Sequence, residues 1–298
     1  MLEPISVDLD EWTLSGEGAN SLVYLHKSND GLVLKLNAEH TPREESENEY
    51  IRSKEAFALG IPSPEPVCFV CDGTRYGTIT KCLKNKKSLA RILSEDKNQM
   101  DAVARSFALL AHNLHSLQCN TAHSDNVAER YRNAVNSCSA IPKEIRERLN
   151  LYADEMEHCT TCLHSDMHIG NVVRSEGRDY WIDFGGFGYG DPDLDFAALL
   201  LIVYFTPKHV VKWLLHISRD DFRDFVDIYG SYYYGDRYNT PELRQKLWHA
   251  ALLRVGYSIT VNPKLRLPLF KDIIIGRKRR FAFKMHILDL LVRRLKNT

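Results

Sequence analysis

The segment between Leu163 and Gly186 constrains the fold most, because short apolar runs there alternate with carboxylate and amide side chains. Asp166 and Asn171 are five residues apart, and Asp183 follows Asn171 by twelve residues. Residues 174–179 are polar and include a glycine, which is typical of a hairpin turn. The pattern predicts two antiparallel strands, with Asn171 at the foot of one and Asp183 at the end of its partner, so that their side chains can converge.

Two hard oxygen ligands that face one point, with a third carboxylate nearby, suit Mg²⁺ held jointly by protein and phosphates. Asp166 is then left to orient a hydroxyl group and to accept its proton. Phosphoryl transfer needs positioning and charge neutralisation more than covalent chemistry, so a few such groups suffice. The alternative, acids in solvated loops, would be the better interpretation of three isolated carboxylates, but not of this ordered array.

The first eighty residues predict a small antiparallel sheet and one helix. Ser28-Asn29-Asp30-Gly31 carries the signal of a hairpin turn between two apolar runs. The expected strands cover residues 12–16, 21–27, 32–36, 67–71 and 76–81. Thr41-Pro42-Arg43-Glu44 has the pattern of a capping box, which predicts a helix over residues 42–59.

The rest of the chain is expected to be mostly helical. Apolar side chains alternate at spacings of three and four residues at Met100, Val103, Phe107, Leu110, Leu114 and Leu117. This spacing predicts one amphipathic helix. We therefore expect an α+β chain in which a sheet-rich domain, residues 1–83, precedes a larger and mostly helical domain, residues 84–298.

Two features of the predicted sheet suit phosphate binding. Gly16 and Gly18 lie between the first two strands, where backbone N–H groups without neighbouring side chains can approach phosphates. Lys35 interrupts the apolar run of the third strand. A lysine in the middle of a strand is normally an edge residue whose amine reaches solvent. Its position about seventeen residues after Gly18 nevertheless adds weight to a phosphate-binding role for the glycines.

The array around Asp166 resembles the catalytic loop His-Gly-Asp-x-His-x-x-Asn and the metal-binding Ile-Asp-Phe of kinase-like phosphotransferases. This superfamily includes aminoglycoside phosphotransferases, choline kinases and homoserine kinases. Here the loop reads His164-Ser165-Asp166-Met167-His168-Ile169-Gly170-Asn171, with Ser165 where the family usually has glycine. The resemblance implies a two-lobed, protein-kinase-like fold with a small antiparallel-sheet lobe and a larger, mostly helical lobe. It also implies ATP or GTP, together with Mg²⁺, as cofactors.

The resemblance implies a role for each matching residue. Asp166 would be the catalytic base, Asn171 and Asp183 the metal ligands, and Asp195 a brace for the catalytic loop. The residues implied at the nucleotide are Gly16, Gly18, Ser21, Lys35, Thr80, Cys82 and His168, with Thr80 and Cys82 in the hinge. The carboxylate partner of Lys35 is open: the family's helix register favours Glu49, whereas the helical wheel favours Glu47.

Composition limits the other function classes. The 39 basic and 39 acidic residues balance, which argues against a general nucleic-acid binder. The balance conceals a gradient, because residues 264–298 carry eleven Lys and Arg against two acids. The longest apolar run, at residues 196–205, is too short to span a membrane. The N-terminus lacks the apolar region of a secretory signal, so a cytoplasmic protein is expected.

The acceptor is expected to be a small-molecule alcohol. The basic C-terminal segment argues against a polycationic aminoglycoside, and the sequence leaves the oligomeric state open. One alternative is a protein-substrate kinase, although no Ala-Pro-Glu segment follows Asp183. Another is a nucleotide-binding regulator with weak catalysis. The pairs Cys68/Cys71 and Cys159/Cys162 have the spacing of zinc ligands, but buried thiols are the simpler interpretation.

Overall fold

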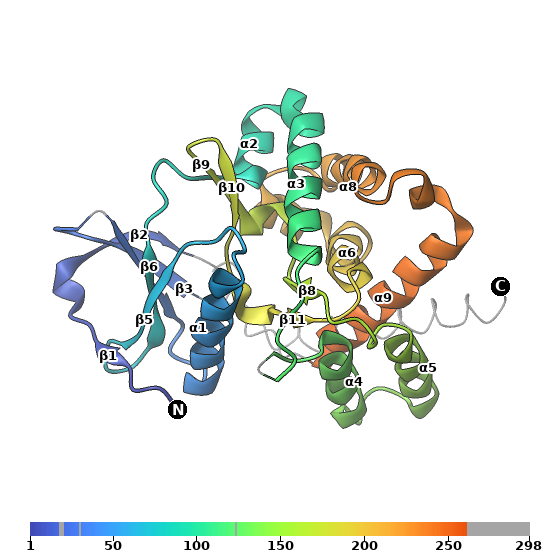
Figure 1. The fold of residues 1–298 in the computed structure, drawn as a ribbon, viewed down its shortest axis with the longest axis horizontal. Helices are drawn as coiled ribbons and strands as arrows, with labels where there is room; N and C mark the ends of the chain where they lie inside the picture. The colour runs from blue at the N-terminus through green and yellow to red at the C-terminus, as the bar shows by residue number, and fades with distance from the viewer. Residues whose placement is uncertain (18–20, 30, 123, 261–298) are drawn as a thin grey trace. The chain divides into compact units, whose positions relative to one another are not determined.

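The computed structural model describes residues 1–17, 21–29, 31–122 and 124–260, which form two compact units (Figure 1). The first unit contains Met1–Leu89 together with Asn171–Phe187. The second contains Ala90–Gly170 and residues 188–260. The segment that carries Asn171 and Asp183 thus groups with the first unit, although it follows much of the second in the chain. Gly18 and the basic segment 264–298 lie outside the described residues.

A six-stranded sheet organises the first unit. In the order of the sheet, its strands are β1 (Ile5–Ser6), β5 (Pro66–Cys71), β6 (Tyr76–Lys81), β4 (Leu32–Asn37), β3 (Ser21–His26) and β2 (Trp12–Glu17). The pairings are antiparallel except for the parallel pair of β1 and β5. The five strands expected from the sequence are all present, each within a residue or two of its expected ends.

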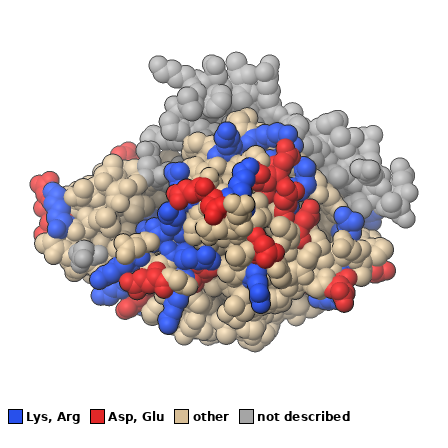
Figure 2. All heavy atoms as spheres, turned by 90° about the horizontal axis from the view of Figure 1, so that it is seen from above, with Lys and Arg blue, Asp and Glu red and all other residues tan. Residues whose placement is uncertain are grey.

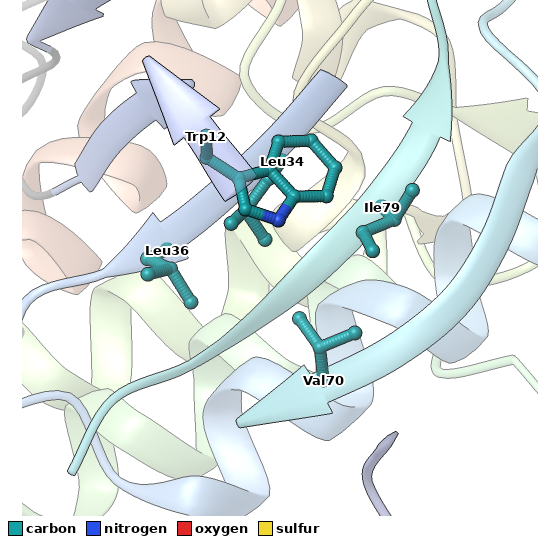
Figure 3. Packing of buried hydrophobic residues seen from close by; sticks show 5 residues of the cluster. All are labelled: Trp12, Leu34, Leu36, Val70 and Ile79. Atoms are coloured by element: carbon teal, nitrogen blue, oxygen red, sulfur yellow. The ribbon is translucent and has the colours of Figure 1, made fainter. Parts of the chain in front are cut away.

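The alternation of side chains along β4 explains how this sheet forms its core. Leu34 and Leu36 are fully buried, and they pack with Trp12, Val70 and Ile79 in the cluster drawn in Figure 3. Because successive side chains of a strand point to opposite faces, Lys35 faces away from this cluster. The hydrophobic core on one face of the sheet therefore directs the lysine to the other face.

Gly77 lets β6 approach β4 closely at this lysine. A Cβ atom on Gly77 would lie 1.9 Å from the carbonyl oxygen of Lys35, which is far inside van der Waals contact. Residue 77 must therefore be glycine if the register of Lys35 opposite Thr78 is to be kept.

Helix α1 (Arg43–Ala58) contacts β5 and β6. The predicted capping box at Thr41 is wrong: the N-cap is Pro42, and no side chain caps the helix. The N–H group of Thr41 instead bonds to the carbonyl oxygen of Ala38, so Thr41 belongs to the preceding turn. Glu44 and Glu45 still lie in the first turn, where carboxylates interact favourably with the helix dipole.

A second, three-stranded sheet completes the first unit. Its order is β10 (Arg178–Trp181), β9 (Val172–Ser175) and β7 (Lys87–Ser88). The β9–β10 pair is the hairpin expected from the sequence, with Trp181 opposite Val172 at its open end. The N–H group of Trp181 donates to the carbonyl oxygen of Pro62, which ties this hairpin to the segment after α1. A short 3-10 helix, η4 (Phe184–Gly186), follows Asp183 and contacts α1.

The second unit is mostly helical. Its α-helices are α2 (Leu89–Glu95), α3 (Met100–His115), α4 (Val127–Ser137), α5 (Lys143–Asp154), α6 (Asp193–Leu200), α7 (Lys208–Leu215), α8 (Arg219–Tyr234) and α9 (Pro241–Thr260). A π-helical segment, Leu201–Phe205, continues α6, and 3-10 turns lie at Lys97–Gln99, Ile169–Asn171 and Gly235–Asn239. A small sheet pairs β8 (Cys162–Leu163) with β11 (Gly188–Tyr189).

The apolar stripe predicted for α3 is confirmed within the helix, while Leu117 lies beyond its end at His115. Val103, Phe107, Leu110 and Leu114 are buried, and α3 packs on α8. The ring of Phe107 meets Tyr229 edge to face at a centroid distance of 5.0 Å. The tyrosine-rich end of α8 therefore contributes to helix packing.

Two features of the described residues concern membranes: the distribution of charge on the surface and the length and polarity of the helices. On the face drawn in Figure 2, acidic and basic side chains are interspersed. Within the described part of the chain, every helix is too short or too polar to cross a membrane.

Candidate functional site

In the first unit, an ion-paired cluster forms around Lys35. Its amine lies 2.5 Å from a carboxylate oxygen of Glu49 on α1 and 3.3 Å from Oδ1 of Asp183. Glu49 is held in turn by Asn37, whose side-chain amide donates to its second oxygen at 3.1 Å. Three elements that are distant in sequence, β4, α1 and the end of the β9–β10 hairpin, thus supply one charged cluster.

Electrostatics keep Lys35 charged in this cluster. Burial by itself would lower the pKa of the lysine, because removal from water disfavours the ammonium ion. The nearby carboxylates of Asp183 and Glu49 outweigh burial and raise the pKa above its ordinary value. Lys35 is therefore a fixed positive charge at neutral pH.

The geometry distinguishes the two candidate partners of Lys35. Glu47 is also buried, but its Oε1 accepts a hydrogen bond from the backbone N–H of Leu2 at 2.5 Å. Glu47 thus binds the N-terminal segment through Leu2, whereas Glu49 forms the ion pair with Lys35.

The end of the hairpin places Asn171 and Asp183 together. The N–H group of Ile182 donates to the carbonyl oxygen of Asn171 at 2.9 Å, so the residues that precede β9 and follow β10 are adjacent. Asn171 is buried, whereas the side chain of Asp183 is 48% exposed. Asp183 has a φ of 68°, in the left-handed region that is sparsely populated by residues other than glycine. Such local strain is often found at functional positions.

The turn after Asp183 is anchored to α1. Arg52 donates from Nη1 to the carbonyl oxygen of Gly185 at 2.5 Å. Helix α1 therefore holds both the partner of Lys35 and the segment that follows Asp183.

A pocket of about 480 Å³ opens elsewhere in the first unit. It is lined by Ser15, Gly16, Val23, Leu25, Cys82, Leu83, Lys84, Asn85 and Lys86. Val23 and Leu25 are alternate residues of β3, so they present one apolar face to the pocket, while the residues after β6 form another wall. A mixed apolar and polar lining of this kind is typical of small-molecule sites.

The predicted nucleotide residues differ in their relation to this pocket. Gly16 and Cys82 line it. Ser21 begins β3, opposite Asn37. Thr80 is not among the lining residues; it lies within β6, opposite Val33 and Pro66. The backbone N–H of Cys82 donates to Gly31, so the hinge is tied to the β3–β4 turn.

Residues 164–170 of the loop that the sequence predicts to be catalytic lie in the second unit, where Asp195 of α6 holds the start of the loop. The carboxylate of Asp195 accepts hydrogen bonds from the N–H groups of His164 at 2.8 Å and Ser165 at 2.6 Å. It also pairs with Nε2 of His115 at 3.1 Å. Burial would raise the pKa of Asp195, but the hydrogen bonds and charge of His115 and the loop hold it below its ordinary value. The loop before Asp166 is thus bonded to a buried carboxylate.

His168 follows Asp166 in the same loop and is also buried. Its Nδ1 accepts the N–H of Gly170 at 3.0 Å, and its Nε2 lies 3.8 Å from Oδ2 of Asp166. A Cβ atom on Gly170 would come within 2.8 Å of the imidazole ring. The ring is therefore packed against the loop, beside the carboxylate of Asp166.

The sequence interpretation missed two contributors to this loop. His115 lies beside the apolar stripe of α3, where a histidine is usually structural, and it contacts Asp195. Arg254 of α9 was not singled out at all, although its Nη2 lies 3.1 Å from Oδ1 of Asp166. A signal for Arg254 was present, because it is a lone charge within the apolar run of residues 250–256.

The cysteine pairs do not belong to a metal centre in the described part of the chain, where no group of three or more His, Cys, Asp or Glu side chains is arranged to hold a metal. Cys68 and Cys71 lie on β5. Cys162 is buried, with its sulfur 3.1 Å from that of Cys119.

Comparison with known proteins identifies the fold and the family. The sequence profile of the phosphotransferase enzyme family matches residues 11–233. An ADP-bound aminoglycoside phosphotransferase, APH(2'')-Ib, is similar in structure, with a TM-score of 0.59, 18% identity and coverage of 93% of this chain and 94% of that chain. A choline/ethanolamine kinase family protein from Mesorhizobium loti has a TM-score of 0.59 and 15% identity, with coverage of 93% and 87%.

A third solved structure, amicoumacin kinase hAmiN in complex with AMP-PNP, has a TM-score of 0.55, 12% identity and coverage of 95% and 90%. No curated protein matches the chain in sequence. The kinase-like α+β fold expected from the sequence is therefore confirmed.

Proposed function

Since the chain belongs to the phosphotransferase enzyme family, we propose that it transfers the γ-phosphate of ATP to a hydroxyl group of a small molecule. The observation that carries this proposal is the cluster of Lys35, Glu49 and Asp183. A lysine whose charge is maintained by a helix glutamate, next to an exposed carboxylate, is the arrangement by which kinases hold nucleotide phosphates and their metal.

The residues at the hairpin end fit a magnesium ion. Asn171 offers an amide oxygen and Asp183 a half-exposed carboxylate, and Mg²⁺ is usually held by one or two carboxylates together with substrate phosphates. When bound there, the ion would neutralise charge on the phosphates. The remaining ligands would come from ATP and water, in keeping with a site that has few protein ligands.

The chain's own residues would perform the remaining tasks. Lys35 would bind phosphate oxygens, and Glu49 would keep its amine in place. Asp166 would orient the acceptor hydroxyl and accept its proton while the new oxygen–phosphorus bond forms and the bond to the β-phosphate oxygen breaks, leaving ADP. Asp195 would keep the loop of Asp166 in its observed conformation through the N–H groups of His164 and Ser165.

The pocket beside Gly16 is proposed to take the purine and ribose of the nucleotide. Val23 and Leu25 provide an apolar surface for the base, and Cys82 lies at the hinge beyond β6. Thr80 is not a lining residue, so we assign base recognition to the lining residues 82–86 instead. The proposal extends to GTP as a second donor, because the apolar surface of Val23 and Leu25 suits the ring system that both purines share.

The small-molecule acceptor is supported by the similar structures, whose names are those of aminoglycoside, choline/ethanolamine and amicoumacin kinases. A cytoplasmic location and the influence of the basic segment 264–298 on acceptor choice stay predictions. No observation on the described residues favours a protein acceptor.

The test is an assay of the purified chain with Mg²⁺, ATP labelled in its γ-phosphate, and a panel of sugars, amino alcohols and aminoglycosides. Label should appear on at least one alcohol, and Asp166→Asn should abolish this transfer. Asp236→Asn, an exposed aspartate elsewhere in the second unit, is the matched control and should behave as wild type. Binding of Mg-ATP with neither hydrolysis nor transfer would instead favour a regulator.

A further inference from the structure

Arg254 of α9 is a nearly buried cation, and its guanidinium group is fixed by three acceptors of the second unit. Its side chain is 11% exposed. Nη1 donates to the hydroxyl of Tyr131 at 2.5 Å and to the carbonyl oxygen of Ser165 at 2.6 Å, while Nη2 donates to Oδ1 of Asp166 at 3.1 Å. Burial of a guanidinium group is costly unless its donors are satisfied. Here the hydrogen bonds to Tyr131 and Ser165 hold the guanidinium group of Arg254 in place, so that its Nη2 contacts Oδ1 of Asp166.

The side chain of Ser165 also helps to hold the loop that Arg254 contacts. The φ of Ser165 is 65°, in the left-handed region that favours glycine, so a residue with a Cβ atom adopts this conformation at an energetic cost. The hydroxyl offsets this, because it lies 3.0 Å from the hydroxyl of Tyr131 and accepts from Nη2 of Arg130 at 3.1 Å. Tyr131 is itself stacked on Tyr257, at a centroid distance of 4.2 Å. Glycine at position 165 could make neither side-chain contact.

The exposure of Asp166 indicates what the contact does. Its side chain is 53% exposed, so water can solvate the carboxylate and no ion pair is required to compensate burial. A purely structural role for Arg254 would be met by Tyr131 and the Ser165 carbonyl. The third contact instead restricts rotation of the carboxylate: Oδ1 is held by Arg254, while Oδ2 lies toward His168, 3.8 Å from its Nε2.

We propose that Arg254 is a positioning residue for phosphoryl transfer, which holds Oδ1 of Asp166 so that Oδ2 is presented to the acceptor hydroxyl. Tyr131 and Ser165 keep the guanidinium group in place. This inference rests on the proposed function, because it assigns Asp166 the task of orienting an alcohol. Precise orientation matters more for transfer to an alcohol than for the slow side reaction with water.

The experiment measures two products in the same samples: labelled phosphate on the alcohol that wild type phosphorylates best, and labelled phosphate released into water. Arg254→Met removes the charge at similar length. We expect the ratio of transfer to hydrolysis to fall about tenfold or more, as for the loss of a charged hydrogen bond, with the KM for ATP within about twofold of wild type. Arg254→Lys keeps the charge but not the planar fork, and should restore part of the ratio.

Tyr131→Phe and Ser165→Ala each remove one hydroxyl and should lower the ratio by smaller factors, about twofold to fivefold. Circular dichroism and a melting curve will show whether Arg254→Met folds. If it does not fold, Tyr131→Phe and Ser165→Ala test the positioning role of Arg254 instead. Arg244→Met changes an exposed arginine on the same helix and is the matched control; it should leave the ratio unchanged.

Three outcomes count against the proposal. If wild type transfers phosphate and every variant keeps its ratio, the inference is wrong while the proposed function stands. If transfer and hydrolysis decline in parallel, Arg254 is only structural, and the inference is again wrong. If wild type transfers phosphate to no alcohol, the proposed function fails and this inference fails with it.

Discussion

The amine of Lys35 lies 2.5 Å from the carboxylate of Glu49, although fourteen residues separate the two in the chain. The contact follows from local causes. Leu34 and Leu36 bury one face of β4, so Lys35 must face the other way, and Asn37 at the end of the same strand binds the second oxygen of Glu49. Strand alternation and the amide of Asn37 thus bring Lys35 and Glu49 together, and the carboxylates of Glu49 and Asp183 keep the lysine charged.

This pair can be tested by removing one charge at a time. Lys35→Met should lower kcat/KM for ATP by about a hundredfold or more, because a charged contact to the phosphates is lost. Glu49→Gln should lower it less, by about tenfold, because the amine remains but loses one partner. Glu47→Gln, on the same helix but bonded to Leu2, is the control and should leave kcat/KM close to wild type. Equal effects of the two glutamate variants would contradict the assignment of Glu49.

The pocket beside Gly16 makes a separate prediction about nucleotide binding. Val23→Phe would fill apolar space in the pocket and should weaken binding of an ATP analogue by at least about tenfold. Isothermal titration calorimetry measures this directly. Val67→Phe, at an exposed position of β5, is the control and should bind the analogue as wild type does. Unchanged affinity in Val23→Phe would place the nucleotide base elsewhere.

Asp195 predicts a pH-dependent contribution to stability. Its pKa is lower in the folded state than the ordinary value near 3.9. A lowered carboxylate pKa stabilises the fold above the unfolded-state pKa, and this stabilisation is lost as pH falls through the folded-state value. Asp195→Asn should therefore cost about 2–4 kcal/mol of unfolding free energy at pH 7, since two loop N–H groups and His115 lose a charged acceptor.

Urea unfolding at several pH values measures this contribution. The difference between wild type and Asp195→Asn should narrow as pH falls below about 4. A difference that stays constant between pH 7 and pH 3 would show that the charge of Asp195 contributes nothing to stability.

Gly77 tests how tightly β6 and β4 are packed. Gly77→Ala places a Cβ atom against the backbone of Lys35, where no flexible side chain can move aside. We expect a loss of about 2–4 kcal/mol in unfolding free energy, typical of overpacking at a rigid contact. Gly73→Ala lies in the β5–β6 turn, where a Cβ meets no atom within 4 Å but the φ of 100° is unfavourable. Gly73→Ala should therefore lower the unfolding free energy less than Gly77→Ala does. An equal loss of unfolding free energy in both variants would contradict overpacking between β6 and β4 as the reason for the effect at Gly77.

Much of the first unit could be predicted because its signals are local. Short apolar runs and the turn signals beside them mark β2 to β6, and the polar turn between Asn171 and Asp183 marks the hairpin. The order of Asp166, Asn171, Asp183 and Asp195 in the sequence also predicts a catalytic loop, which stays a prediction.

The remainder depends on contacts between distant residues. The helical wheel favoured Glu47 over Glu49 as the partner of Lys35 and was wrong, because it takes no account of the N-terminal segment, where the N–H group of Leu2 donates to Glu47. Arg254 reaches Asp166 across 88 residues of sequence. The capping box failed for a local reason, since Pro42 itself occupies the N-cap position and leaves Thr41 outside the helix.

The central claim, that the chain is a small-molecule phosphotransferase, is tested most directly by following phosphorus through one reaction. ³¹P NMR of the purified chain with Mg-ATP and the panel of alcohols should show a new phosphate monoester that grows in step with ADP, and Asp166→Asn should produce neither. If Mg-ATP binds but its three phosphorus resonances stay unchanged with every alcohol, or if Asp166→Asn forms the monoester at the wild-type rate, the account of this site is contradicted.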